Sequence, residues 1–274
     1  MHSLGSVLRS LWGVVEDLSP HGIRAFAVFG SAARGVDFIP CRSDVDVLVV
    51  APSGAGLPRR LGIPELGPRI SIALYTPEEL EKLLSSGHPL LLHLYKASIV
   101  YLDDGVLSSL LSHVPSSIPR GTVRVEELST ATALALGLEK LVLGIPEEAV
   151  DHLHHALRHL ARALVGEGSP TTLFPAYDVE VEMVLGKRSS ALAELLREVR
   201  GARARCSVTE DEAANLLART WDAAAQNLGV EIPRLNRVVE LCGGGRIRDV
   251  EVPLFVHREE RSIAVRCGST VVKP

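Results

Sequence analysis

The sequence predicts an α/β (α+β) domain with a mixed sheet, followed by an α-helical bundle and a short β-rich tail. In the first part, short apolar runs without helical period alternate with helical patterns, which is typical of strands and helices packed in layers. From Val125 to Leu228 apolar residues recur at helical spacing without clear strands, whereas Val250–His257 and Ser262–Arg266 are rich in β-forming residues. We therefore place the three parts at residues 1–118, 119–228 and 229–274.

Composition restricts the class of protein. Of the 274 residues, 46% are hydrophobic but 4% are aromatic, so we expect an aliphatic core and no aromatic platform for stacking nucleobases. The formal net charge of -4 excludes the overall positive charge of a protein that wraps nucleic acid. No apolar run has membrane length, and glycine and charged residues interrupt Met1–Leu18 where a signal peptide would need an apolar core. We expect a soluble, cytoplasmic protein without membrane contact.

The scarcity of amide residues indicates the type of source organism, and the spacing of the cysteines indicates the state of the thiols. Gln226 is the only glutamine in the sequence and asparagine is also scarce, a depletion of thermolabile amides that is typical of thermophile proteins. The four cysteines, Cys41, Cys206, Cys242 and Cys267, are far apart, without a CxxC pair for zinc or the dense spacing of a disulfide framework. We therefore expect a thermophilic source and isolated thiols.

Local patterns predict the elements of the first domain. Apolar residues between Leu4 and Leu18 recur at helical spacing and predict an amphipathic helix. Thr76 to Glu79 matches a capping box with proline at the first helical position, which predicts the start of another helix. The proline-rich stretch Pro115–Pro119 is the expected domain boundary. The remaining expected elements are strands at Arg24–Phe29, Val45–Val50, Ile70–Tyr75 and Ile99–Leu102, and helices at Pro77–Ser85, Pro89–Lys96 and Asp104–His113.

Two acids at the start of an apolar strand form the first candidate site. Asp44 and Asp46 are at positions i and i+2, which project to the same face of a strand, while the valines between and after them pack on the other. Neighbouring carboxylates repel each other, and a divalent cation such as Mg²⁺ relieves the repulsion. Upstream, Gly30 and Ser31 lie where a strand ends and a short helix begins, so that backbone N–H groups and a hydroxyl can face a phosphate.

These residues resemble a family signature. Phe29–Gly35 followed by Ser43–Val49 resembles the GS…DxD motif of the DNA polymerase beta-like nucleotidyltransferase superfamily, close to the minimal nucleotidyltransferases of archaea and bacteria. The resemblance covers Ala25 to Asp103. It implies transfer of a nucleoside monophosphate from an NTP, expected to be ATP, to a hydroxyl group with release of pyrophosphate.

The resemblance also assigns roles to individual residues. Asp44 and Asp46 would be catalytic and would hold two Mg²⁺ (or Mn²⁺) ions, which activate the acceptor hydroxyl and stabilise the charge on the attacked phosphate. The nucleotide and its phosphates would be bound by Gly30, Ser31, Arg34 and Ser43. The acceptor is not identified by the sequence; RNA and protein hydroxyl groups are both candidates.

One position departs from the family pattern. Active members place a third carboxylate on a neighbouring strand, and the matching position in Arg69–Tyr75 is Ser71, which cannot replace a carboxylate as base or strong metal ligand. Glu65 would take that role if the register of the strand differs. The alternative is a catalytically weak or inactive nucleotide-binding module, such as an antitoxin-like regulatory partner.

The helical part offers weaker candidates. His155 and His159 have the i, i+4 spacing of a metal-binding pair, but a polar helix face or a partner contact explains the histidine-rich helix better. Val150–Leu164 faintly resembles the HEPN helical domains that accompany minimal nucleotidyltransferases, without their RNase motif, because Ala163 stands where that motif needs histidine. A substrate-binding or dimerising bundle is expected, and a homodimer is a candidate assembly. A local basic stretch that could contact RNA is formed by Arg197, Arg200, Arg203 and Arg205.

Overall fold

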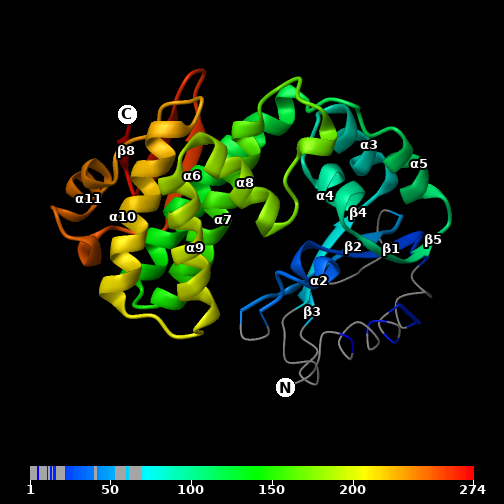
Figure 1. The fold of residues 1–274 in the computed structure, drawn as a ribbon, viewed down its shortest axis with the longest axis horizontal. Coiled ribbons are helices and arrows are strands. Elements are labelled where there is room, and N and C mark those ends of the chain that lie inside the picture. Colours follow the sequence, from blue (N-terminus) through cyan, green and yellow to red (C-terminus); the bar gives the residue numbers. More distant parts are fainter. Residues whose placement is uncertain are drawn as a thin grey trace. The chain divides into compact units, whose positions relative to one another are not determined.

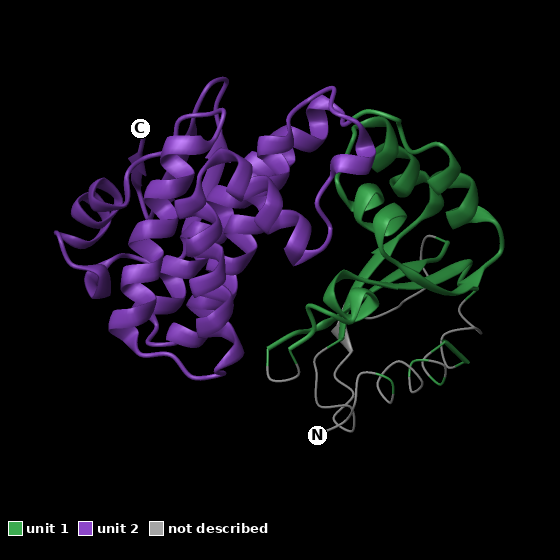
Figure 2. Cartoon of the chain, viewed as in Figure 1, with its two compact units in different colours: residues 1–117 green, residues 118–274 purple. Residues whose placement is uncertain are grey.

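The computed structural model describes residues 22–39, 42–52, 60–61 and 70–274, together with Gly5, Leu11, Gly13, Val15 and Glu16. The chain divides into two compact units, residues 1–117 and 118–274 (Figure 2). The first unit is a mixed sheet with helices. The second is a helical bundle that also contains the C-terminal strands. The fold class expected from the sequence is confirmed.

The sheet of the first unit has five strands in the order β3-β4-β2-β1-β5. β1 runs antiparallel to both β2 and β5, β2 runs parallel to β4, and β3 runs antiparallel to β4. β2 is therefore the central strand and is paired on both sides. The strands span Ala25–Phe29 (β1), Val45–Val50 (β2), Arg60–Leu61 (β3), Ile70–Tyr75 (β4) and Ile99–Asp103 (β5).

Alternation of side chains along β2 gives the sheet two buried faces. Val47 and Val49 pack on one face with Leu11 and Val15, which lie in the helix predicted over Leu4–Leu18; most other residues of that helix lie outside the described residues. Leucines of three short helices cover the other face, and Figure 1 shows these helices gathered on one side of the sheet. They are α3 (Pro77–Ser85), α4 (Leu90–Lys96) and α5 (Val106–Ser112), and the short α2 (Gly30–Arg34) follows β1.

The capping box predicted at the start of α3 is present. The Thr76 hydroxyl accepts a hydrogen bond from the Glu79 backbone N–H (3.2 Å), and the Glu79 carboxylate accepts one from the Thr76 N–H (2.8 Å). The two bonds satisfy donors that the helix leaves unpaired at its N-terminus, which explains why its first residue could be predicted correctly.

The second unit has one continuous aliphatic core, formed by its helices and completed by a small sheet. Trp221 is buried in this core and donates its indole N–H to the carbonyl of Pro233 (2.7 Å). The helical spacing found from Val125 to Leu228 corresponds to five α-helices: α6 (Arg120–Val142), α7 (Pro146–Val165), α8 (Asp178–Arg188), α9 (Ser190–Ala204) and α10 (Glu210–Asn227).

The C-terminal segment is more structured than the sequence indicated. It pairs with itself as an antiparallel sheet in the order β6-β7-β8, and α11 (Leu235–Gly243) precedes this sheet. Leu254, Ile263 and Val272 of the sheet belong to the same core as the helices, so the tail completes the second unit. The strands are β6 (Leu254–Arg258), β7 (Ile263–Cys267) and β8 (Thr270–Val272).

The prediction of isolated thiols is wrong. Cys242 at the end of α11 and Cys267 at the end of β7 form a disulfide with Cα atoms 5.9 Å apart, and Cys206 is also disulfide-bonded. The separation of 25 positions between Cys242 and Cys267 in the sequence gave no indication of pairing, because the fold of the tail brings the two residues together.

Candidate active site

The two candidate acids lie at the start of the central strand. Asp44 directly precedes β2, and Asp46, its second residue, is paired with Phe29 of β1 on one side and with Ser71 of β4 on the other. Asp46 shares its face of the strand with Leu48 and Val50, which the helices cover. The strand therefore fixes the position of Asp46 through neighbours on both sides.

The electrostatics of the site disfavour the ionised form of Asp46. Burial, followed by the neighbouring Asp44 carboxylate, raises the pKa of Asp46 from 3.8 to about 6, and the Arg34 guanidinium only partly opposes this. A carboxylate pair held in this way is costly to ionise near neutral pH, and a bound cation would remove the cost.

Gly30 approaches the Asp46 carboxylate closely. Its φ of 71° lies in the left-handed region, and a Cβ on this residue would overlap Oδ2 of Asp46 and lie 3.2 Å from its Cγ. The positive φ and the close contact with Asp46 therefore each favour glycine at position 30. The next residue, Ser31, is half-buried, and its hydroxyl makes no hydrogen bond among the residues that the structure describes.

Gly30→Ala is expected to displace the Asp46 side chain, because both the positive φ and the Cβ overlap act against alanine. We expect a loss of about 1–3 kcal/mol in the free energy of unfolding, measured by urea titration. Gly105→Ala is a suitable control. Gly105 also has positive φ, but a Cβ there would meet nothing within 4 Å, so a smaller loss separates strain from contact with Asp46. Equal losses would contradict the role assigned to that contact.

The two further predicted phosphate contacts are held by local structure. The Arg34 Nε lies 2.7 Å from Oδ2 of Asp37, and both side chains are buried. The Ser43 hydroxyl accepts a hydrogen bond from the Ile39 N–H (2.9 Å). Sequence reasoning missed Asp37, because the turn after α2, and not a helix, brings its carboxylate back to Arg34. Binding of phosphate by Arg34 or Ser43 stays a prediction, and Asp37 would compete for the Arg34 guanidinium.

The face around Asp46 supplies no third carboxylate among the described residues. In the register of β2 and β4, the residue beside Asp46 is Ser71, and Ala73 and Tyr75 follow it on the same face. No group of three His, Cys, Asp or Glu side chains is placed to hold a metal ion within the described parts of the chain. Glu65 lies outside the described residues.

Among the comparisons with known proteins, a family model matches the part of the chain that contains these residues. Residues 8–101, about a third of the chain, match the family model described as "Nucleotidyltransferase domain". The N-terminal unit carries a nucleotidyltransferase domain. No curated protein matches the chain. A solved structure described as a nucleotidyltransferase-like protein from Exiguobacterium sibiricum is 16% identical, with coverage of 82% of this chain and 78% of that one and a TM-score of 0.30.

Beyond the nucleotidyltransferase domain, two histidines of the histidine-rich helix α7 contact acidic side chains. Nε2 of His154 lies 3.1 Å from Oδ2 of Asp178, and Nδ1 of His159 lies 2.5 Å from Oε2 of Glu126. Burial lowers the pKa of His154 to about 4, so its ring is neutral near pH 7. The pair His155 and His159 is not part of a metal-binding group among the described residues, which favours a structural role for the helix.

The basic stretch predicted as an RNA contact is neutralised within the unit. Arg197 and Arg200 both contact Glu182, at 3.1 and 3.2 Å. The other two arginines also contact carboxylates: Arg203 lies 2.7 Å from Asp151, and Arg205 pairs with Glu212. Each of these arginines therefore contacts an acidic side chain of the same unit, and contact of the stretch with RNA stays a prediction.

In the described part of the chain, no helix is long and apolar enough to cross a membrane.

Proposed function

We propose that this chain is a divalent-cation-dependent nucleotidyltransferase that transfers a nucleoside monophosphate from an NTP to a hydroxyl group. The observation that carries the proposal is the carboxylate pair Asp44 and Asp46 at the start of the central strand, with Gly30 directly against Asp46. The family match over residues 8–101 supports nucleotidyl transfer in general. ATP as the donor and an RNA or protein hydroxyl as the acceptor are the more specific parts of the proposal.

The donor set fits Mg²⁺ or Mn²⁺. Both ions prefer carboxylate oxygens, and the raised pKa of Asp46 reflects its burial beside the Asp44 carboxylate. Asp44 and Asp46 would hold the cation, which when bound would supply Lewis-acid stabilisation of the attacked phosphate. With two protein carboxylates, the triphosphate and water would complete the coordination.

The other residues of the site would position the nucleotide. The backbone at Gly30 and the Ser31 hydroxyl would bind triphosphate oxygens, because Gly30 lies against Asp46 and Ser31 follows it in the chain. The lack of a side chain at Gly30 would let phosphate and carboxylate share one cation without steric hindrance. Arg34 would contribute positive charge to the site while its guanidinium stays paired with Asp37.

Incubation of the purified protein with each labelled NTP, Mg²⁺ or Mn²⁺ and RNA or protein acceptors should give label transfer with release of pyrophosphate. Asp44→Ala should lower the rate at least about a hundredfold, because it removes half of the carboxylate pair; this equals about 2.7 kcal/mol of activation free energy. The exposed Asp222→Ala in α10 is the matched control and should keep the parental rate. Turnover unaffected by Asp44→Ala would refute the proposed site.

Ser71 favours a second candidate function, a nucleotide-binding module with weak or no turnover. A serine beside Asp46 leaves the pair without a third carboxylate from β4. Removing one of three anionic ligands weakens the binding of a second cation first, so one cation with bound NTP and no released pyrophosphate is the expected state of such a module.

Ser71→Asp distinguishes the two candidates. The substitution places a third carboxylate in register with Asp46. If the lack of this group limits turnover, label transfer should rise at least about tenfold and Mn²⁺ should bind more tightly, as measured by calorimetry. Ser71→Asn is the control, because asparagine is similar in size to aspartate but carries no charge. A fully active parent protein that Ser71→Asp inhibits would exclude the second candidate.

A further inference from the structure

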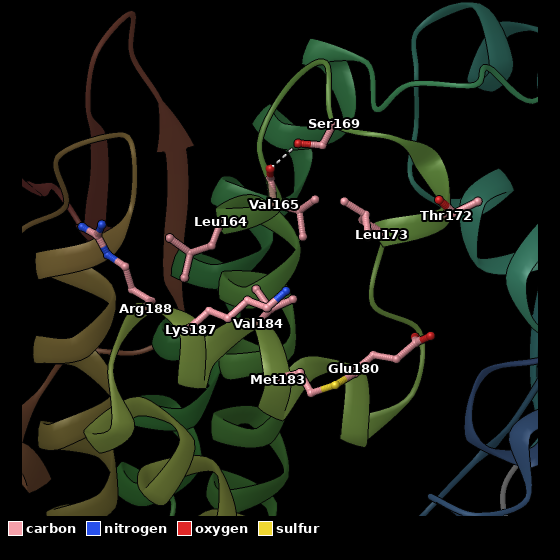
Figure 3. A pocket seen from close by; sticks show the side chains of 10 residues that line it. All are labelled: Leu164, Val165, Ser169, Thr172, Leu173, Glu180, Met183, Val184, Lys187 and Arg188. Carbon is pink, nitrogen blue, oxygen red and sulfur yellow. Dashed lines mark hydrogen bonds between the residues drawn. The ribbon is translucent and has the colours of Figure 1, made fainter.

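A groove in the second unit is lined mainly by apolar side chains and carries positive charge at its edge. It is bounded by the end of α7, by the short helix at Thr171–Leu173 and by α8, as Figure 3 shows. Its volume of about 430 Å³ falls within the range of small-molecule sites. The apolar lining is provided by Leu164, Val165, Leu173, Met183 and Val184.

Two of these apolar side chains are much more exposed than the side chains of a hydrophobic core. Leu173 is 57% exposed and Met183 is 56% exposed, and they line opposite sides of the groove. Large apolar side chains that are exposed together in a hollow indicate a binding surface, since solvating them is costly.

The charges at the groove favour an anion. Lys187 makes no hydrogen bond or ion pair among the described residues, so its ammonium is available. Arg188 uses Nε to bind Asn227 (3.0 Å) and keeps its other donors. The acid of the lining, Glu180, turns its carboxylate toward the loop before α8, where it accepts hydrogen bonds from the N–H groups of Ala176 and Tyr177 (Figure 3).

We propose that this groove binds a small amphiphilic anion, with an apolar body between Leu173 and Met183 and an acidic head at Lys187. The inference is independent of the proposed nucleotidyl transfer, because all of its residues belong to the second unit. The apolar walls supply affinity for the body of the ligand, and the single unpaired ammonium selects the sign of its head.

The test uses three twelve-carbon amphiphiles that differ in their heads, below their micelle-forming concentrations and with the full chain. Dodecanoate should displace the fluorescent anion anilinonaphthalene sulfonate, whereas dodecanol should compete at least fivefold less well and dodecyltrimethylammonium at least tenfold less well. Lys187→Gln should weaken dodecanoate at least fivefold and leave dodecanol unchanged. Arg237→Gln, which removes an exposed charge that does not line the groove, should change neither.

Val184→Trp should fill the groove and abolish displaceable fluorescence while circular dichroism stays unchanged. Equal competition by the anionic and cationic amphiphiles, or full dodecanoate binding by Lys187→Gln, would overturn the proposal. Absence of any dye binding by the parent protein would overturn it as well.

Discussion

At pH 8 and without divalent cations, Asp46→Asn will be more stable than the parent protein by up to about 3 kcal/mol. The pKa of Asp46 in the folded protein is about 6, above its ordinary value of 3.8, because burial and Asp44 disfavour the ionised form. The folded state thus holds this proton more tightly than the unfolded state, and the parent protein loses stability as the pH rises from about 4 to 6. Asparagine cannot ionise and avoids this loss.

Scanning calorimetry at pH 5 and pH 8, with chelator or with Mg²⁺, measures the effect. Mg²⁺ should stabilise the parent protein more at pH 8 than at pH 5, and Asp46→Asn should lose most of this gain. Asp222→Asn, an exposed change on α10, serves as the control and should leave both the pH profile and the Mg²⁺ response unchanged. A parent protein that is as stable as Asp46→Asn at pH 8 would show that the carboxylate pair is already compensated.

Asp178→Ala will destabilise the second unit by about 3–5 kcal/mol, the largest effect expected of a single substitution. Asp178 is 5% exposed, and Arg158 contacts it at 2.5 Å and Arg200 at 3.4 Å. Burial raises its pKa, but the hydrogen bond from His154 and the positive charges of the arginines outweigh this and hold the pKa well below the usual range. Removal of the carboxylate takes away a counter-charge of the buried Arg158.

Urea unfolding of Asp178→Ala and of Glu198→Ala gives the comparison. Glu198 pairs with Arg219 between α9 and α10, but both side chains are about half exposed, so its loss should cost about 1 kcal/mol or less. Asp178→Ala combined with Arg158→Met should recover part of the stability, because the buried charge that has lost this carboxylate is then removed as well. A loss of stability from Asp178→Ala as small as that from Glu198→Ala would contradict the role assigned to the contact of Asp178 with Arg158.

Much of the fold could be predicted because its signals are local. The apolar runs of β2 and β4 and the capping box at Thr76 gave correct bounds for three elements. β3 is a two-residue strand that exists through its pairing with β4, and the disulfide of Cys242 depends on contacts distant in the sequence. Neither feature has a local pattern.

In the candidate site, too, the features with a local sequence pattern could be predicted and those that depend on the fold could not. The spacing of Asp44 and Asp46 indicated a shared face, and the aligned strand indicated Ser71, which β4 pairs with Asp46. The ion pair of Arg34 with Asp37 was missed because it depends on the turn that follows α2. Arginine partners in the second unit were missed for a related reason, since helix packing decides which acids reach them.

The buried indole of Trp221 gives this chain an internal optical reporter. The sequence has two tryptophans, and one falls in each unit, Trp12 in residues 1–117 and Trp221 in residues 118–274. In Trp12→Phe, emission would come from Trp221 alone, which is 1% exposed and bonded to the Pro233 carbonyl. Unfolding of the helical unit would then shift the emission to longer wavelength, so that its stability could be followed separately within the intact chain.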